Sequence, residues 1–555
     1  MLFLLLLMLQ LPAHAQDRTQ ARSMVISDRG IVATSQTLAS QAGAQVLALG
    51  GSAMDAAIAA NATLGVVEPE SCGIGGDLFA IYWEAKTGKL TAINASGWAP
   101  KALTIDVLKS MGHSTMPQEG IQSVTVPGCV DGWARLHQRF GRLPWNDLFQ
   151  PAIYYAEHGY PVTEIIHEAW HLEEAKLARD ENARRIFLRE GASPRLAEVW
   201  RDPQMAAALK LIAAEGPAAF YRGAIAKAIL KTSGRLGGKM TAADLSEFES
   251  EWVRPISTVY RGWKVYELPP NGQGIAALEM LNILSLFPLP GYAPRGVDEL
   301  HVEMEAQKLA YADLHRYVAD PRFSQVPVAG LLAMDYARER ASEIDRGKAR
   351  CEVAPGNPVA VHGDTIYLSA VDRDGNIVSL IQSLYQHFGS GVVVDDYGFA
   401  LQNRGGLFEM DPRHPNALAP RKRPFHTIIP AFMQKDNVHI GFGIMGGLNQ
   451  AQAHAQFVSN VADHGMNIQA ALEAPRFTKK TFGGCDVMIE NRVPAQVRTA
   501  LTAKGHQLQV VGDFSNEMGG GQAVIHDSAS GINYGASDPR KDGAAVPEAH
   551  PYYGR

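Results

Sequence analysis

The chain has 555 residues, of which 46% are hydrophobic and 19% are charged, a balance typical of a folded soluble protein and not of a disordered one. Its formal net charge of −6 provides no basic surface for nucleic acid or an anionic membrane, so neither is expected as a partner. The sequence contains no evident internal repeat or low-complexity tract.

The first residues have the pattern of an export signal. Residues 2–11 are largely apolar, and Ala13-His14-Ala15 provides a small-residue cleavage site. The apolar run is shorter than the roughly 20 residues that a membrane-spanning helix needs. No Lys or Arg precedes it, which departs from the usual pattern and leaves a misassigned start codon as the alternative. We predict a signal peptide at 1–15, a periplasmic or secreted protein, and no membrane span.

The first part of the chain alternates short strands with helices. The strands expected at 78–83 and 90–95 are joined by Lys86-Thr87-Gly88, a turn that predicts an antiparallel hairpin. Between residues 133 and 253 the pattern is mainly helical. The other elements expected before residue 320 are strands at 30–34 and 255–267 and helices at 37–49, 53–64, 146–158, 163–188, 203–214, 274–286 and 297–317.

A loop-like stretch separates this part from a strand-rich remainder. Residues 351–364 contain two prolines and two glycines without any sustained period, which predicts an exposed loop. Strands at 365–371 and 377–384 follow, joined by a turn at 372–376. Helices are expected later, at 450–463 and 495–504. Thr365 therefore stands where a loop meets a sheet.

Thr365 can be interpreted in two ways. Strands favour β-branched residues, so it can be an ordinary strand residue. Alternatively, cleavage of the bond between Asp364 and Thr365 would create a chain terminus. Its α-amino group, with an unperturbed pKa of roughly 7.7 to 8.0, could then act as the base for the hydroxyl of the same residue. These residues alone favour the first interpretation.

An ordered series of motifs favours the second interpretation. Gly363-Asp364-Thr365, followed by Asp372-x-Asp374-Gly375-Asn376 and Phe388-Gly389-Ser390-Gly391, resembles the γ-glutamyltransferase family of N-terminal-nucleophile hydrolases. The resemblance implies an α+β fold, a four-layer αββα sandwich, which strand hairpins flanked by helices suggest independently. The other blocks that resemble the family, in chain order, are Gly50-Gly51-Ser52-Ala53-Met54-Asp55-Ala56-Ala57, Gly73-Ile74-Gly75-Gly76-Asp77, Ala99-Pro100, Val126-Pro127-Gly128, Pro269-Pro270-Asn271-Gly272-Gln273-Gly274, Gly446-Gly447 and Gly535-Ala536-Ser537-Asp538-Pro539-Arg540.

The resemblance also implies a precursor that cuts itself between Asp364 and Thr365. The products would be a large subunit, 16–364, and a small subunit, 365–555. Because strands are expected on both sides of the cut, we expect the two subunits to form one αββα domain.

The resemblance assigns roles to residues around the predicted nucleophile, Thr365. The family's glycines that match Gly446 and Gly447 contribute to the oxyanion hole, a role suited to glycines that precede a helix. The family residue that matches Ser383 is a threonine that hydrogen-bonds the nucleophile, and a serine hydroxyl can do the same.

Substrate recognition departs from the pattern of the family. Typical members hold the glutamyl carboxylate with an arginine at the position of Ser96, which a serine cannot replace in bidentate binding. They hold the α-amino group with an acidic residue at the position of Leu407 and an asparagine at that of Tyr385. A serine pair of the family becomes His426-Thr427 here. Contacts to a zwitterionic head group are therefore missing.

Arg404 offers a replacement. The segment 401–408, in which it lies, resembles the γ-glutamyltransferase-like branch that includes oxamate amidohydrolase. We predict that Arg404 binds a substrate carboxylate, and that Asn403, Tyr385, His426 and Thr427 line the pocket. An ion pair within the protein or at its surface is the alternative role for Arg404.

The predicted protein is an autoprocessed threonine amidohydrolase with a small-molecule amide as its substrate and no cofactor or metal. It would hydrolyse, in preference to transferring, a γ-glutamyl or similar carboxylate-bearing acyl amide such as glutathione or oxamate. One alternative is a zinc peptidase, because His167-Glu168-Ala169-Trp170-His171 matches H-E-x-x-H, although Glu190 is a poor third ligand. Another alternative is a catalytically silent binding paralogue.

Three further features carry structural expectations. The four cysteines, Cys72, Cys129, Cys351 and Cys485, are widely spaced, which favours buried single thiols over a zinc site or a disulfide framework. The segment 73–77 lacks the third glycine of a dinucleotide fingerprint, so tight backbone packing explains it better. Arg421-Lys422-Arg423 is expected to be a solvated turn.

Overall fold

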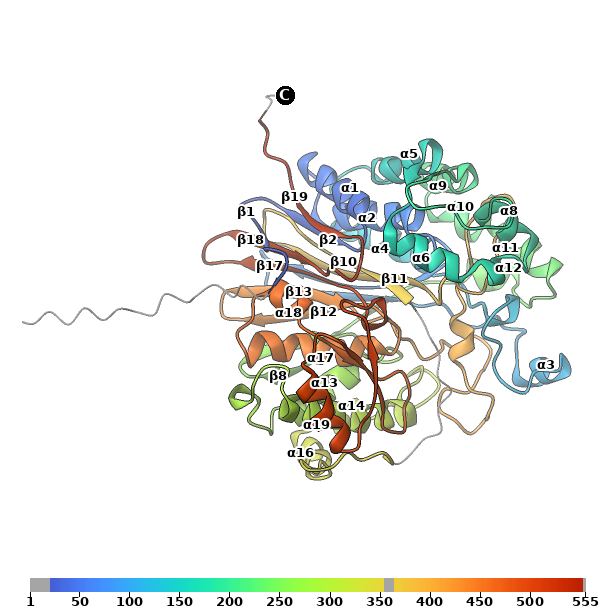
Figure 1. Cartoon of the computed structure of the whole chain (residues 1–555). Helices are drawn as coiled ribbons and strands as arrows, with labels where there is room; N and C mark the ends of the chain where they lie inside the picture. The colour runs from blue at the N-terminus through green and yellow to red at the C-terminus, as the bar shows by residue number, and fades with distance from the viewer. Residues whose placement is uncertain (1–19, 354–363, 553–555) are drawn as a thin grey trace, which may run out of the picture.

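The computed structural model describes residues 20–353 and 364–552, without the side chains of Asp364 and Thr365. The predicted signal peptide and most of the predicted cleavage loop lie outside these residues. Figure 1 shows the described chain as stacked layers, with two sheets in the middle and helices outside each of them. The predicted four-layer αββα architecture is confirmed.

The first sheet, sheet I, has seven strands in the order β19-β2-β10-β11-β3-β4-β7. All neighbouring strands in it are antiparallel. Its strands are β2 (Ile31–Thr34), β3 (Asp77–Glu84), β4 (Lys89–Ala95), β7 (Glu251–Val253), β10 (Asp364–Val371), β11 (Ile377–Tyr385) and β19 (Ala544–Pro547).

The second sheet, sheet II, also has seven strands, in the order β1-β18-β17-β13-β12-β9-β8, and is antiparallel throughout. Strands that precede residue 364 and strands that follow it occur in both sheets. Its strands are β1 (Val25–Ser27), β8 (Ile256–Tyr260), β9 (Trp263–Glu267), β12 (Ala431–Lys435), β13 (Val438–Ile444), β17 (Gly521–Asp527) and β18 (Ile532–Ser537).

The core of sheet I is apolar on both faces, which explains why its strands have nearly continuous hydrophobic sequences. On β3, Phe79 and Ile81 belong to the cluster between the sheets, whereas Leu78 and Ala80 belong to the cluster under the helices. This alternation follows from the two-residue period of a strand. All nine residues of β11 are buried, so the centre of sheet I is a rigid support for residues at its ends.

Helices cover the outer face of each sheet (Figure 1). α2 is alanine-rich and buried along its whole length, and Ser52 and Asp55 form a capping box at its start. On the sheet I side lie α1 (Thr37–Ala48), α2 (Ala53–Val67), α4 (Cys129–Phe140), α5 (Gln150–His158), α6 (Glu164–Leu172), α8 (Glu181–Phe187), α9 (Pro203–Glu215), α10 (Pro217–Tyr221) and α11 (Ala224–Arg235), and on the sheet II side lie α13 (Gly274–Leu284), α14 (Val297–Tyr317), α17 (Asn449–Ala462) and α18 (Ile468–Glu473).

The remaining elements are short. They are α3 (Ile105–Ser110), α7 (Glu174–Leu177), α12 (Ala242–Ser246), α15 (Val328–Leu331), α16 (Met334–Ser342) and α19 (Ala495–Ala503), the 3-10 turns η1 (Ile121–Ser123), η2 (Trp145–Phe149), η3 (Leu289–Gly291), η4 (Arg404–Leu407) and η5 (Asn516–Met518), a sheet of β14 (Phe477–Thr478), β15 (Asp486–Glu490) and β16 (Gln507–Val511), and the pair β5 (Tyr160–Pro161) and β6 (Val199–Trp200). Within the described ranges, no helix combines the length and the apolarity needed to cross a bilayer.

Two predicted elements are wrong in extent. Residues 163–188 form three short helices and not one, because α6 ends at Leu172 and Asp180 caps a new helix by accepting from the Ala183 N–H at 2.9 Å. Residues 255–267 form two paired strands, since Arg261 and Gly262 turn the chain with positive φ. The predicted hairpin of β3 and β4 and the predicted helix at 297–317 are confirmed.

The expectation of single thiols is wrong for two of the four cysteines. Cys351 and Cys485 form a disulfide across 134 residues of sequence, and the Gly484 N–H donates to the Cys351 carbonyl at 3.0 Å beside it. This contact depends on long-range folding, which cysteine spacing does not reveal. Cys72 and Cys129 are buried free thiols, as expected.

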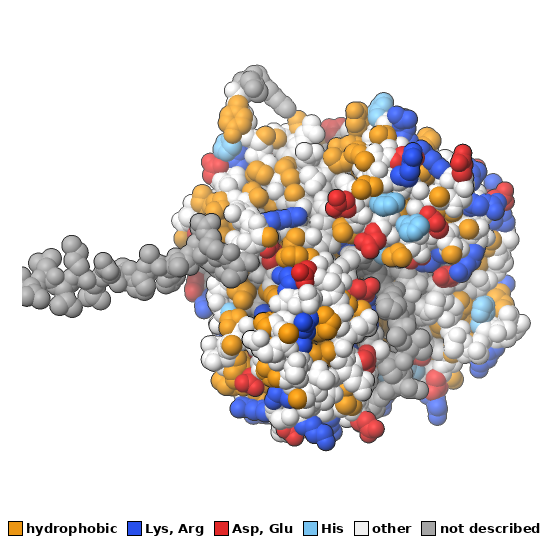
Figure 2. All heavy atoms as spheres, in the orientation of Figure 1, with side chains coloured by type: hydrophobic (Ala, Val, Ile, Leu, Met, Phe, Trp, Pro, Cys, Tyr) orange, Lys and Arg blue, Asp and Glu red, His pale blue; other side chains and the backbone are white. Residues whose placement is uncertain are grey.

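Charged side chains of both signs are interspersed on the molecular face in Figure 2, and no continuous basic patch covers it.

Candidate active site

The predicted nucleophile lies where the pairing of β10 with β11 is irregular. Asp364 pairs with Tyr385, but Ile366 pairs with Gln382. One residue of β10, Thr365, therefore faces two residues of β11, which is the arrangement of a β-bulge. Bulges redirect side chains at the ends of strands and recur next to active sites.

Ser383 is one of the two residues that face this bulge. It is fully buried, and its Oγ accepts from the Tyr385 N–H at 2.7 Å. On the other side of β11, Ser383 pairs with Asp77, the first residue of β3. Thr365, Ser383 and Asp77 thus lie on three adjacent strands at the same end of sheet I.

Gly446 and Gly447 lie between the end of β13 and the start of α17. Their φ values of 117° and 61° belong to the left-handed region that glycine adopts readily. Within the described part of the chain, neither of their N–H groups donates to an acceptor. Gln273 holds this turn in place, because its Nε2 donates to the carbonyls of Gly447 and Thr427 at 2.7 Å and 2.6 Å.

Arg404 lies at the start of η4 and is fully buried. Its Nη1 donates to the Thr427 Oγ1 at 2.6 Å, and its guanidinium lies 4.7 Å from the centre of the Tyr385 ring. Its Nε is 3.9 Å from Asp77 Oδ2, which is ion-pair distance but too long for a hydrogen bond. Among the described residues, Nε and Nη2 have no hydrogen-bond partner.

The charge on Arg404 is retained in spite of burial. Desolvation lowers the pKa of its guanidinium to about 10, so the group is still cationic at neutral pH. Asp77 balances this cation at ion-pair distance, but the two remaining donors of Arg404 are buried without a hydrogen-bond acceptor among the described residues, which is unfavourable. The unused edge, Nε and Nη2, presents two parallel donors of the kind that bind a carboxylate.

His426 is fully buried beside Arg404, and its Nε2 lies 3.0 Å from Asp77 Oδ2. Burial, with a further contribution from the Arg404 charge, lowers the pKa of His426 to about 4, so the imidazole is neutral at pH 7. The carboxylate of Asp77 can only accept, which assigns the proton to Nε2 and leaves a lone pair on Nδ1. In the described structure, that Nδ1 has no hydrogen-bond partner.

Asn403 and Tyr385 both lie next to Arg404 and stabilise the chain around it. The Asn403 side chain donates to the Gln118 carbonyl at 2.7 Å and to Gln386 Oε1 at 2.8 Å, and it accepts from the Gln386 N–H at 3.2 Å. Tyr385 has a φ of 83°, a conformation that costs roughly 1–3 kcal/mol for a non-glycine residue. This conformation ends β11 and places the ring under the guanidinium of Arg404.

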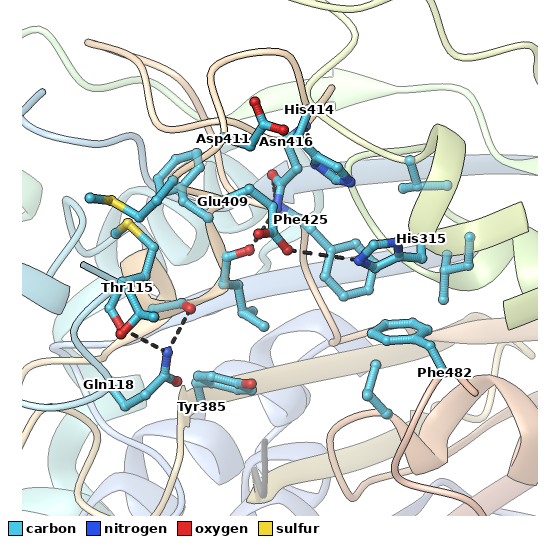
Figure 3. Close-up of a pocket in the computed structure, with 18 of the residues that line it drawn as sticks. Thr115, Gln118, His315, Tyr385, Glu409, Asp411, His414, Asn416, Phe425 and Phe482 are labelled. Carbon is cyan, nitrogen blue, oxygen red and sulfur yellow. Dashed lines mark hydrogen bonds and ion pairs between the residues drawn. The ribbon is translucent and has the colours of Figure 1, made fainter. Parts of the chain in front are cut away.

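A cavity of about 340 Å³ adjoins these residues. Figure 3 shows Tyr385 and Gln118 toward one end of it and the group Glu409, His414 and Asn416 toward the other. The cavity is lined by Ser114, Thr115, Met116, Gln118, Leu314, His315, Val318, Tyr385, Gly406, Leu407, Phe408, Glu409, Met410, Asp411, His414, Asn416, Phe425, Leu448 and Phe482.

Among the residues that the structure describes, two groups of side chains are close enough to hold a metal ion. In the first, the ammonium of Lys308 donates to Glu305 Oε1 at 2.6 Å and already neutralises the only carboxylate. In the second, His414 Nδ1 accepts from the Asn416 N–H at 3.1 Å. The groups are His301, Glu305 and His506, and His315, Glu409 and His414, with the ligand atoms of each within 4.8 Å of one another.

Sequence comparison identifies the family of the chain. A family model described as gamma-glutamyltranspeptidase matches residues 39–548. The chain belongs to the γ-glutamyltranspeptidase family. The family and the fold that were predicted from the motifs are thus confirmed, and the chain is an enzyme of that family.

Individual members of the family are similar over nearly their whole length. The chain is 38% identical over 529 residues to the glutathione hydrolase-like YwrD proenzyme of Bacillus subtilis (strain 168), with 94% of this chain and 99% of that protein covered. It is 33% identical over 531 residues to the oxamate amidohydrolase proenzyme of Klebsiella pneumoniae, covering 94% and 99%. The crystal structure of cephalosporin acylase from Bacillus halodurans is 43% identical, with a TM-score of 0.90 over 97% of this chain and 99% of that one.

Ser96, the residue predicted to stand where typical family members have an arginine, has a structural role. Ser96 is buried, and its Oγ donates to Asn94 Oδ1 at 2.6 Å and accepts from Asn271 Nδ2 at 3.2 Å. Its carbonyl accepts from Arg423 Nε at 2.8 Å. Lys422 and Arg423 are themselves buried, so the expected solvated turn at 421–423 is wrong, because these cations satisfy carbonyl groups in the interior.

The H-E-x-x-H motif lies on α6, away from these residues in sequence and in its contacts. His167 Nδ1 is 2.9 Å from the Pro194 carbonyl, and His171 Nδ1 is 3.0 Å from Glu174 Oε1. Across the described ranges, no third histidine, cysteine or acidic residue joins the two histidines in a possible metal site. The geometry therefore lends no support to the peptidase alternative.

Two residues of this region were missed by sequence reasoning. Asp77 ends the motif 73–77, which was interpreted only as tight packing, and Gln273 lies in the motif 269–274, which was used only as a family marker. The tight packing is present, since a Cβ on Gly76 would lie 2.3 Å from Gln382 Nε2. Both motifs combine glycine with a polar residue, which was the available signal.

Proposed function

We propose that this protein is a precursor that cleaves itself between Asp364 and Thr365 and then hydrolyses an amide whose acyl group carries a carboxylate. The observation that carries the substrate class is the fully buried Arg404, whose Nε and Nη2 have no partner among the described residues. The names of the relatives, which include proenzymes of a glutathione hydrolase-like protein and an oxamate amidohydrolase, support the self-cleavage and the reaction class.

The proposed reaction uses both groups of the new terminus. The Thr365 α-amino group takes the proton of its own hydroxyl, and the oxygen forms a bond to the substrate carbonyl carbon. The N–H groups of Gly446 and Gly447 stabilise the oxyanion, and Ser383 orients the Thr365 hydroxyl. The C–N bond then breaks as the amine takes the proton, and water hydrolyses the acyl ester to release the acid and restore Thr365.

The same residues favour an acyl group without an α-ammonium. Asp77, the carboxylate beside Arg404, already accepts from His426 and from the Gly97 N–H at 3.0 Å. The ammonium of a γ-glutamyl head group has three N–H donors, and the unpartnered Nδ1 of His426 can accept only one of them. The oxalyl group of oxamate carries no hydrogen-bond donor, so it needs only the two donors of Arg404.

Self-cleavage is tested by replacing the nucleophile. Thr365→Ala is expected to leave one uncut chain without amidase activity, whereas the parent protein shows two chains on a reducing denaturing gel, with the shorter chain starting at Thr365. An uncut but folded parent protein would instead support a silent binding paralogue. A cut and active Thr365→Ala variant would refute the proposed nucleophile.

Export is part of the proposal. We propose that residues 1–15 are removed as a signal peptide and that the mature protein acts in the periplasm or outside the cell. The Cys351–Cys485 disulfide supports an oxidising compartment, in which such bonds persist. Mass spectrometry of the secreted or periplasmic fraction should find an N-terminus near Gln16, and recovery only in the cytoplasm with residue 1 intact would contradict it.

A further inference from the structure

The carboxylate contacts leave a large part of the candidate site without a role. Arg404 and His426 are fully buried, and neither lines the cavity of about 340 Å³. An acyl group held by these two residues must therefore be small. A substrate of any size has to place its remaining part somewhere else.

The cavity meets the candidate active site at one end. Tyr385, which lines it, is opposite Asp364 in the β10–β11 ladder and lies under the guanidinium of Arg404. Leu448, another lining residue, directly follows the glycine pair 446–447. The scissile amide of a substrate would thus lie beside this end, with the cavity open to the group on its nitrogen.

The walls of the cavity suit an apolar and flat group. Leu314, Phe425 and Phe482 line it together with the Tyr385 ring, and Figure 3 shows Phe425 and Phe482 between the Tyr385 end and the end with His414. Aromatic and aliphatic walls bind arylalkyl groups by burying their apolar surface.

The far end of the cavity is polar and acidic. His315 Nε2 lies 3.8 Å from Glu409 Oε1, and His414 is adjacent, with ring centres of the two histidines 5.1 Å apart. Burial lowers the pKa of His414, which favours its neutral form. The nearby Asp411 is paired with Arg413, whose Nη2 lies 2.9 Å from its Oδ2, so the carboxylate of Glu409 determines the charge of this end. A group that donates hydrogen bonds or carries positive charge fits it.

We propose that this cavity binds the leaving amine of the substrate, and that this amine is an arylalkyl group with a hydrogen-bond donor or ammonium at its far end. The inference rests on the proposed function and adds the identity of the amine side. Leaving groups as small as ammonia would leave the cavity unused.

The test compares three amides with one acyl group: oxamate, N-benzyl oxamate and N-(4-aminomethylbenzyl) oxamate. For the parent enzyme, kcat/KM should be at least about tenfold higher for the benzyl amide than for oxamate, because the ring buries apolar surface in the cavity. Phe482→Ala should reduce this ratio about tenfold. Phe323→Ala, the same deletion at a residue that is 47% exposed and outside the cavity, should leave the ratio unchanged.

Glu409→Gln tests the polar end with little change of shape. It should remove most of the additional preference for the aminomethyl compound, about 1.5-fold to fivefold for a partly exposed ion pair, and leave the benzyl-to-oxamate ratio unaltered. The proposal would be overturned if the parent enzyme had nearly equal kcat/KM values for N-benzyl oxamate and oxamate. It would also be overturned if Phe482→Ala lowered kcat/KM equally for both compounds.

A binding measurement separates this inference from the proposed function. If no amide is hydrolysed, calorimetric titration of the full-length Thr365→Ala chain with 4-(aminomethyl)benzylamine should still detect binding that Phe482→Ala abolishes. That result supports the cavity while the proposed reaction fails. Absence of binding together with absence of hydrolysis overturns both.

Discussion

Replacement of Arg404 by lysine tests the carboxylate site most directly. Arg404 uses Nη1 for Thr427 at 2.6 Å and has Nε and Nη2 left for substrate. Lysine keeps the positive charge that offsets Asp77, so the variant avoids an unbalanced buried carboxylate. It cannot, however, donate in parallel to two carboxylate oxygens while it also reaches Thr427.

The size of the effect follows from the contacts. Two charge-assisted hydrogen bonds contribute about 1.5–3 kcal/mol each, and the ammonium of lysine can restore one of them. A net loss of about 1.5–3 kcal/mol corresponds to a decrease in kcat/KM of roughly 10- to 100-fold. The loss should be confined to substrates with a carboxylate.

The assay uses oxamate and its neutral analogue oxamide. The parent enzyme should prefer oxamate, and Arg404→Lys should lower kcat/KM for oxamate while that for oxamide changes less than about threefold. Arg189→Lys, at an arginine whose side chain is 50% exposed, serves as the matched control, and the two chains on a reducing gel show that the variants fold and mature. An equal loss on both compounds would refute carboxylate recognition by Arg404.

Two further predictions follow from other contacts. Because Cys351 precedes the proposed cleavage site and Cys485 follows it, the disulfide should join the two subunits, giving one band on a denaturing gel without reductant and two bands with it. Cys485→Ser should give two bands under both conditions. Two bands from the unreduced parent protein would contradict the bridge. His426 has a pKa of about 4 in the folded chain, against roughly 6.5 in the unfolded chain. Between these pH values the unfolded state binds more protons at this residue, so the free energy of unfolding falls as the pH is lowered from 6.5 to 4. Urea unfolding at several pH values should show that the free energy of unfolding declines less steeply with falling pH in His426→Gln than in the parent protein. An equally steep decline would exclude His426 as the cause of the lost stability.

Local elements were predictable because their signals are local. The β10–β11 hairpin follows from two apolar runs joined by an Asp-Gly turn, and α14 has the predicted bounds because its helical period is continuous. The residues 163–188 have the same period, but the cap at Asp180 interrupts it, and a capping residue inside a periodic run is a weak signal. Motif resemblance implied the layer order, which the pattern of strand hairpins flanked by helices suggested independently.

Contacts between distant residues were the part that sequence reasoning could not reach. The role of Arg404 as a carboxylate ligand stays a prediction, and nothing local indicated that Thr427 would take only one of its donors. The Cys351–Cys485 bond and the Asp77–His426 contact join residues 134 and 349 positions apart. Both depend on how the strands of the sheets are ordered, which no single sequence window contains.

The motif 73–77 shows how packing and chemistry are combined in this fold. Gly76 lies so close to β11 that a Cβ would be 2.4 Å from the Ser383 carbonyl oxygen, so only glycine allows the chain to approach there. Because the chain comes this close to β11, β3 can begin at Asp77, and Asp77 pairs with Ser383. The Asp77 carboxylate therefore lies beside His426 and near Arg404. A residue larger than glycine at position 76 should therefore displace Asp77 and impair substrate binding, even if the sheet itself forms. The packing interpretation and the functional interpretation of the motif thus describe the same constraint.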